Sequence, residues 1–173
     1  HRVRTEQPPI VVLEAGVERS LDDLADDARE IIESYPEGAT VALFDVNAAG
    51  MAETVGTFDS IHSWTVDMTD FSAVCAAVRA VEEKLGPVER LYNCAAIMPF
   101  GLLVEQDNAI IHKQMAINYG GLVNITQAVL PGMLQRGHGD FVSFASMAAI
   151  IPMLYTGAYT ASKYAVRAFT ETL

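Results

Sequence analysis

The chain has 173 residues, 51% of them hydrophobic, so it can bury a core the size of one domain. Its formal net charge of -11 argues against a nucleic-acid partner and against an anionic membrane surface, because both select for basic patches. No apolar run has the length of a membrane span, and the start does not resemble a signal peptide, so we expect a cytoplasmic location. Cys75 and Cys94 lack metal-ligand spacing, and we interpret both as free thiols.

Strands and helices are predicted to alternate along the chain, after a polar extension at residues 1–9. Short apolar runs bounded by turn residues predict strands at residues 10–13, 41–44, 63–66, 90–93 and 140–144. Apolar residues at helical spacing predict helices at residues 21–32, 70–85, 106–135 and from 157 onward. The third of these could be two helices. The alternation predicts a parallel sheet with helices on both faces.

The ends of the predicted strands are the first places to look for function, because ligands collect outside the carboxyl ends of an open parallel sheet. The residues there are Gly16, Asp45, Asp67, Asn93 and Ser146. An acidic residue after the second strand suits a ribose diol, since a carboxylate accepts both hydroxyl protons and repels a 2'-phosphate. Asp45 therefore favours NAD over NADP, although many aspartates at strand ends only cap a turn.

A tyrosine and a lysine stand four residues apart, as Tyr159 and Lys163. If the segment after Gly157 is helical, this spacing places the phenol and the ammonium on one face, one turn apart. A neighbouring cation stabilises a phenolate, which suits the pair to acid/base chemistry. The alternative is a solvated helix face. We interpret Tyr155 and Tyr164 as packing or pocket wall.

Five motifs in order resemble the short-chain dehydrogenase/reductase family. They are Asp67-Met68-Thr69, Asn93-Cys94-Ala95-Ala96, Asn118 within a predicted helix, Ser146, and Tyr159-Thr160-Ala161-Ser162-Lys163. The resemblance covers residues 10–173 and implies one domain with a three-layer, Rossmann-like, doubly wound α/β fold. It also implies association into a dimer or tetramer through the long helices.

The resemblance implies a catalytic tetrad of Asn118, Ser146, Tyr159 and Lys163. Tyr159 would exchange a proton with the substrate oxygen, and Ser146 would hydrogen-bond to that oxygen. Lys163 would stabilise the Tyr159 phenolate and hold the nicotinamide ribose, while Asn118 would anchor a water of the proton relay. The reaction would interconvert a secondary alcohol and a ketone.

The cofactor implied by the resemblance is NAD, with NADP possible. The residues implied to bind it are Gly16, Asp45, Asp67, Met68, Asn93, Ala95, Tyr159 and Lys163. The segments Met98-Pro99-Phe100 and Pro152-Met153-Leu154 follow strands at the edge of the site, so they could form an apolar wall for an uncharged substrate. Ordinary loop packing is the alternative.

Two features depart from the family pattern. The first turn, Thr-Gly-x-x-x-Gly-Ile-Gly in the family, corresponds to Ala15–Asp22, where only Gly16 is retained and Asp22 adds negative charge at an expected phosphate site. The chain also ends at Leu173, before the family's further strand and substrate lobe, so we expect it to be incomplete. A non-catalytic dinucleotide-fold scaffold or interaction module is the alternative to an enzyme.

Overall fold

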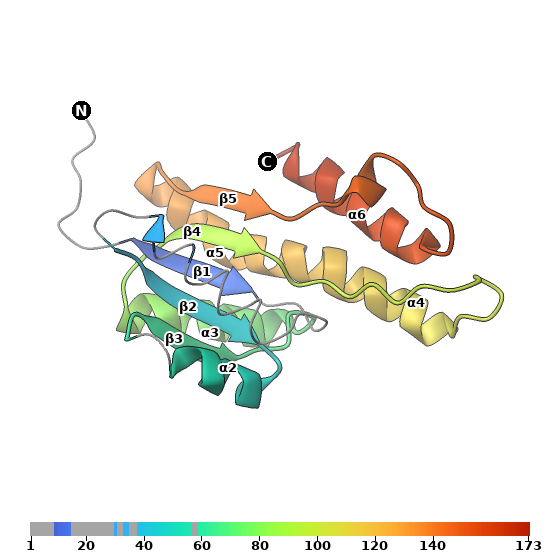
Figure 1. The fold of residues 1–173 in the computed structure, drawn as a ribbon. Helices are drawn as coiled ribbons and strands as arrows, with labels where there is room; N and C mark the ends of the chain where they lie inside the picture. Colours follow the sequence, from blue (N-terminus) through green and yellow to red (C-terminus); the bar gives the residue numbers. More distant parts are fainter. Residues whose placement is uncertain (1–8, 15–29, 31–32, 35–37, 57–58) are drawn as a thin grey trace.

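The structure is a computed structural model, and it describes residues 9–14, 30, 33–34, 38–56 and 59–173. In these ranges five parallel strands form one sheet in the order β3-β2-β1-β4-β5 (Figure 1). The strands are β1 (Ile10–Glu14), β2 (Thr40–Asp45), β3 (Ile61–Thr65), β4 (Val88–Asn93) and β5 (Asp140–Ser143). The five predicted strands are thereby confirmed.

The helices of the described ranges connect these strands. They are α2 (Ala48–Val55), α3 (Phe71–Lys84), α4 (Asn108–Met115), the π-helical segment η1 (Ala116–Gly121), α5 (Leu122–Arg136), the 3-10 turn η2 (Met147–Ala149) and α6 (Gly157–Thr170). None of them combines the length and the apolar character that a membrane crossing requires. The predicted helix at residues 21–32 lies almost entirely outside the described residues.

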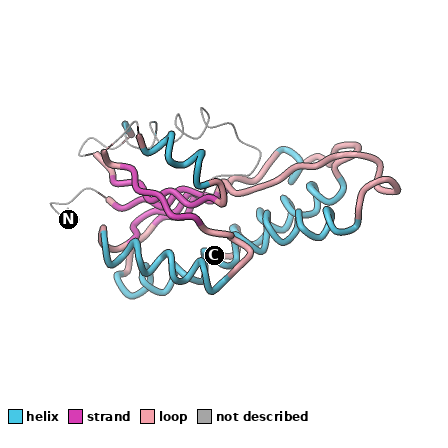
Figure 2. Tube along the Cα trace, turned by 90° about the horizontal axis from the view of Figure 1, so that it is seen from below, coloured by secondary structure: helices cyan, strands magenta, loops and turns pink. Residues whose placement is uncertain are grey.

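Helices lie on both sides of the sheet (Figure 2). Because successive strand residues point to opposite faces, each strand contributes to two cores. On β1, Ile10 and Val12 pack into a core with α3 and α5, while Val11 and Leu13 pack into a second core with Met51 of α2. The three-layer, Rossmann-like doubly wound fold is therefore confirmed.

The structure differs from the sequence prediction in several elements, and β4 begins two residues earlier than the predicted strand 90–93. Helix α2 was not predicted, and β3 begins two residues earlier and ends one residue earlier than the predicted strand 63–66. The predicted helix 106–135 is interrupted by the π-helical segment η1 at Ala116–Gly121. An extra residue per turn in a π-helix shifts the register of the side chains, and an apolar repeat in the sequence does not reveal such a shift.

The sheet order defines where a ligand can bind. The strand β1 lies between β2 and β4, so the chain crosses over from the β3 edge to the other side of β1. Such a switch point opens a crevice at the carboxyl ends of the strands. The register aligns Glu14 with Phe44 and with Asn93, and Asn93 with Ser143. The loop after β4 and the turn before α6 extend beyond these strand ends (Figure 1).

Candidate active site

Helix α6 carries the tyrosine and lysine, and the described helix confirms their common face. The Nζ atom of Lys163 lies 5.9 Å from the centroid of the Tyr159 ring. The lysine is only 4% exposed, and its Nζ donates a hydrogen bond to the carbonyl oxygen of Phe144 at 2.7 Å. A buried cation is costly unless it is hydrogen-bonded, so this bond fixes α6 against the end of β5.

Ser146 lies three residues after β5 and begins the turn η2. Its Oγ accepts a hydrogen bond from the backbone N–H of Ala148 at 3.1 Å, which leaves the hydroxyl proton to donate elsewhere. Helix α6 contacts the same turn: the Tyr164 hydroxyl donates to the Ile150 carbonyl at 2.9 Å, and Arg167 donates to the Ala149 carbonyl at 3.3 Å. The serine turn and the Tyr159 helix are therefore held together.

Asn118 lies in the π-helical segment η1 and is 1% exposed. Its Oδ1 accepts from the Ile97 N–H at 2.8 Å, and its Nδ2 donates to the Ile97 carbonyl at 3.0 Å and to the Ser162 Oγ at 2.9 Å. The side chain thus joins three segments: the helix, the loop after β4 and helix α6. Both Nδ2 protons of Asn118 are therefore committed to protein atoms.

Two buried polar residues beside Asn118 were not predicted from the sequence. Ser162 is fully buried, accepts from Asn118 and donates to the Tyr159 carbonyl at 2.7 Å. Gln114 is almost fully buried and donates to the Ile97 carbonyl at 3.2 Å. One signal for Ser162 was available, because it lies four residues before Val166 on the buried face of α6.

The loop after β3 contains Asp67 and Met68. The Oδ1 of Asp67 accepts from both the N–H and the hydroxyl of Thr69, at 2.8 and 2.7 Å, so the exposed carboxylate is held in one orientation. Met68 is buried, and its carbonyl accepts from the Asn124 side chain at 2.8 Å. Helix α5 therefore fixes this loop at the carboxyl end of the sheet.

Asp45 ends β2 and is 8% exposed. Burial raises the pKa of its carboxyl above the ordinary value of 3.8, and hydrogen bonds from the backbone of Asn47 and Val46 partly oppose this rise. The Asn47 N–H donates to Oδ1 at 2.6 Å. A buried carboxylate that lacks full solvation gains from further hydrogen-bond donors, such as the two hydroxyls of a ribose.

The remaining predicted cofactor residues divide into two groups. Asn93, the last residue of β4, and Ala95 are buried at the switch point between β1 and β4. Gly16 and the residues up to Asp22 lie outside the described residues.

Across the described ranges, no group of three or more His, Cys, Asp or Glu residues could hold a metal ion.

Comparison with known proteins gives consistent matches. Residues 28–173 match the family model described as short chain dehydrogenase. The chain is 34% identical to the putative oxidoreductase SadH of Mycobacterium tuberculosis over 139 residues, covering 78% of this chain and 50% of that protein. It is 35% identical to 2-dehydro-3-deoxy-L-rhamnonate dehydrogenase (NAD(+)) of a Sphingomonas species over 138 residues, covering 79% and 55%.

A solved structure shows the same fold. The structure of actinorhodin polyketide ketoreductase with NADPH superposes with a TM-score of 0.87 at 26% sequence identity, covering 97% of this chain and 64% of that one. The chain thus spans about half the length of these two curated relatives and about two thirds of the solved chain.

Proposed function

The chain belongs to the short-chain dehydrogenase/reductase family, and from this premise we propose that the whole protein is an NAD(P)-dependent oxidoreductase interconverting a secondary alcohol and a ketone. The observation that supports this most is the position of Lys163. Its Nζ is buried beside the Tyr159 ring, 5.9 Å from the centroid, and is held by the Phe144 carbonyl. A cation held there stabilises negative charge on the phenol when Tyr159 gives up its proton.

Each of the other site residues has a role that follows from its contacts. In the reducing direction Tyr159 donates its proton to the substrate oxygen, and Ser146 donates its hydroxyl proton as a hydrogen bond to the same oxygen. Asn118 holds helix α6 against the loop after β4, and so positions Tyr159 relative to that loop. The nicotinamide supplies the hydride when it is bound.

A dinucleotide would bind at the carboxyl ends of β2, β3 and β4, beside the described members of the predicted cofactor residues. Asp45 would bind the adenosine ribose, Asp67 and Met68 would contact the adenine, and Asn93 and Ala95 would line the path toward the nicotinamide. A carboxylate at Asp45 favours NAD over NADP, because a 2'-phosphate would meet a negative charge. NADP remains the second cofactor to test.

Tyr159→Phe is the decisive test of the proposed function. Removing the hydroxyl removes the proton donor, so we expect turnover to fall by at least about a hundred-fold, while NADH affinity, measured by fluorescence titration, stays almost unchanged. Tyr164→Phe is the matched control, since the Tyr164 hydroxyl bonds to the Ile150 carbonyl on another face of α6. If the two variants had equal turnover rates, the proposed function would be wrong.

A second candidate is a non-catalytic dinucleotide-fold scaffold or interaction module. It is favoured by the acidic turn Ala15–Asp22, where only Gly16 of the family's glycines is retained. Titration with NADH separates the two candidates: an enzyme binds it, and a scaffold does not bind it even at millimolar concentration. The expected dimer or tetramer is tested by native mass spectrometry, and the expected cytoplasmic location by cell fractionation.

A further inference from the structure

The two segments that flank the candidate active site carry no charged residue. They are the β4 segment, residues 91–104, and the α6 segment, residues 141–162, and neither contains Asp, Glu, Lys or Arg. In the whole chain 19% of residues are charged. The first segment runs from β4 through Asn93, and the second runs through Ser146 and Tyr159. A substrate at the site therefore meets uncharged side chains from both.

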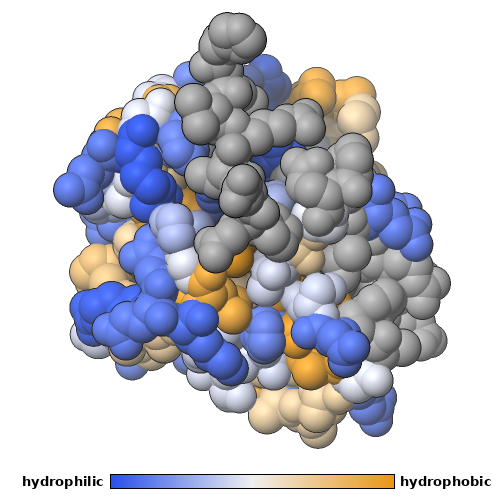
Figure 3. Space-filling model, turned by 90° about the vertical axis from the view of Figure 1, so that its left-hand side faces the viewer, coloured by the Kyte–Doolittle hydropathy of each residue, from blue (hydrophilic) through white to orange (hydrophobic). Residues whose placement is uncertain are grey.

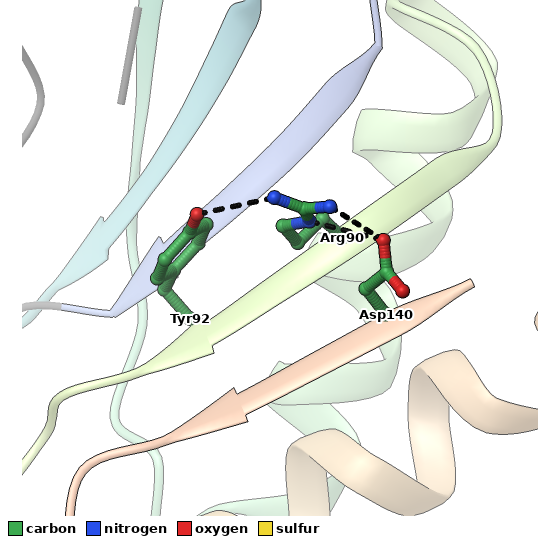
Figure 4. Close-up of polar contacts among 3 residues, drawn as sticks. All are labelled: Arg90, Tyr92 and Asp140. Atoms are coloured by element: carbon green, nitrogen blue, oxygen red, sulfur yellow. Dashed lines mark hydrogen bonds and ion pairs between the residues drawn. The ribbon is translucent and has the colours of Figure 1, made fainter. Parts of the chain in front are cut away.

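Charged residues lie next to the ends of the two segments in the sequence, but they do not offer a free cation to the site. Arg90 and Asp140, which directly precede the segments, pair with each other at 2.6 Å, and Arg90 also bonds to the Tyr92 hydroxyl (Figure 4). Lys163, which follows the second segment, is buried and bonded to the Phe144 carbonyl. Glu105, which follows the first segment, would repel an anion.

Large apolar side chains are exposed along both segments. Val104 is 92% exposed and Leu154 is 84% exposed. The other exposed apolar residues there are Phe100, Leu102, Leu103, Phe144, Met147, Ile150, Ile151, Met153 and Tyr155. The end of the molecule that carries the amino ends of the strands differs, because hydrophilic residues predominate among its described atoms, with smaller apolar patches between them (Figure 3). Among the described residues, most of the large apolar side chains that are exposed thus lie on these two segments.

A backbone hydrogen bond joins the two segments. The Gly101 N–H donates to the Tyr155 carbonyl at 2.9 Å. Tyr155 has a φ of 65°, a conformation that is unfavourable for a bulky residue and that surrounding contacts must hold. The buried Thr156 holds the turn, since its hydroxyl bonds to the Met153 carbonyl and to the Thr160 hydroxyl, each at 3.0 Å. The Gly101–Tyr155 hydrogen bond thus joins the two segments, and we call the surface that they form together the wall.

We propose that this wall, formed by the β4 and α6 segments, selects an uncharged substrate with an extended alkyl or aromatic substituent. Residues such as Leu154 would contact the substituent, while Ser146 and Tyr159 contact the reacting oxygen. Burying the apolar substituent against exposed apolar side chains supplies binding energy, and a carboxylate or phosphate in the same place would lose its hydration without gaining a cation. This inference rests on the proposed function for the location of the reacting carbon.

The first experiment compares ketones with NADH as the reductant. We expect kcat/KM to rise by about three- to four-fold for each added methylene from 2-butanone to 2-octanone. We expect 7-oxooctanoate, in which a carboxylate replaces the terminal methyl group of 2-octanone, to be at least about ten-fold poorer than 2-octanone. Equal kcat/KM for the short and long ketones, or a preference for the keto acid, would overturn the inference and leave the proposed function intact.

The second experiment uses two exposed leucines as a matched pair. Leu154→Asn should lower kcat/KM for 2-octanone by about three-fold or more, without changing that for 2-butanone. Leu134→Asn is the control, because Leu134 is 71% exposed on α5, away from both segments. If both variants lowered kcat/KM for 2-octanone, or if neither did, the proposed role of the wall would be contradicted. A wild-type dimer that Leu154→Asn alone converts to monomers would show that the surface is an interface, and would also overturn the inference.

A binding measurement keeps the inference testable if no ketone is reduced. Saturation-transfer NMR with 2-octanol should give a signal for the wild-type protein that Leu154→Asn weakens and Leu134→Asn preserves. If this pattern of NMR signals is found while no ketone is reduced, the proposed function is wrong and the apolar wall is supported. The absence of a 2-octanol signal in the wild-type protein would overturn the wall.

Discussion

At the scale of single residues, Asn118 is the structural centre of the site. Its amide makes three hydrogen bonds to buried groups, two with the Ile97 backbone and one with the Ser162 hydroxyl. The sequence predicted a role for Asn118 through a family motif, but it did not predict these partners. The reason is that Ile97 and Ser162 are 21 and 44 residues away from it along the chain, and pairings across such distances follow from the fold.

Asn118→Ala should therefore destabilise the protein more than an ordinary loss of one hydrogen bond. It leaves the Ile97 N–H and carbonyl and the Ser162 hydroxyl without this partner in a buried region, so we expect a loss of about 2–4 kcal/mol in the free energy of unfolding. The control is Asn124→Ala, which removes one bond to the Met68 carbonyl and should cost about 1 kcal/mol. Urea denaturation measures both, and similar losses would contradict the central position of Asn118.

Asp45 connects an effect on stability with the proposed binding of a cofactor. Burial raises the pKa of its carboxyl above 3.8, so its ionised form is less favourable in the folded protein than in the unfolded chain. The stability associated with the protonated carboxyl is present below pH 3.8 and is lost as the pH rises through the folded-state pKa. Asp45 therefore reduces stability at neutral pH.

Asp45→Asn should for this reason raise Tm at pH 7, because the amide accepts the Asn47 N–H without carrying a charge. The gain should shrink as the pH falls toward 3.8. The same variant should bind NADH about ten-fold or more weakly, since a charged acceptor for the ribose hydroxyls is lost. Scanning calorimetry across pH and NADH titration check the two effects, and a Tm gain that is independent of pH would refute the first.

At the scale of elements, local sequence signals predicted most of the fold. Helix α3 has Asp70 as its N-cap, with the Asp70 side chain accepting from Ala73 N–H, and this was readable from the sequence. Helix α2 was missed because it has eight residues and no acidic residue in its first turn. Its cap is the Asn47 side chain, which accepts from the Gly50 N–H. The π-helical turn η1 was missed because an apolar pattern does not distinguish π from α geometry.

The two glycines of η1 should respond differently to substitution. A Cβ at Gly121 would lie 3.1 Å from the Met68 Cβ, whereas a Cβ at Gly120 would meet only the Met115 carbonyl, at 4.0 Å. Gly120→Ala should stabilise the protein by up to about 1 kcal/mol, because alanine loses less backbone entropy. Gly121→Ala should be less stable than Gly120→Ala and should weaken NADH binding by moving Met68. Chemical denaturation and NADH titration test this, and a reversed order of stability would contradict the close approach.

At the scale of the whole chain, the formal charge of -11 on its 173 residues acts on every anionic ligand. NADH is itself an anion, so the protein's field opposes its approach at low ionic strength. Raising the salt concentration from about 10 to 150 mM shortens the Debye length from about 30 Å to about 8 Å. We expect the Kd for NADH to fall with added salt, the opposite of the trend for a nucleic-acid-binding protein. Isothermal titration at the two salt concentrations checks the sign, and a rising Kd would refute it.

The order of the strands also determines how the molecule can be made. The central strand β1 hydrogen-bonds to β2 on one side and to β4 on the other, yet β4 begins at Val88. A ribosome adds about 5–20 residues per second, so β1 waits for several seconds to over ten seconds before its second neighbour exists. During that time one edge of an apolar strand is open to other chains.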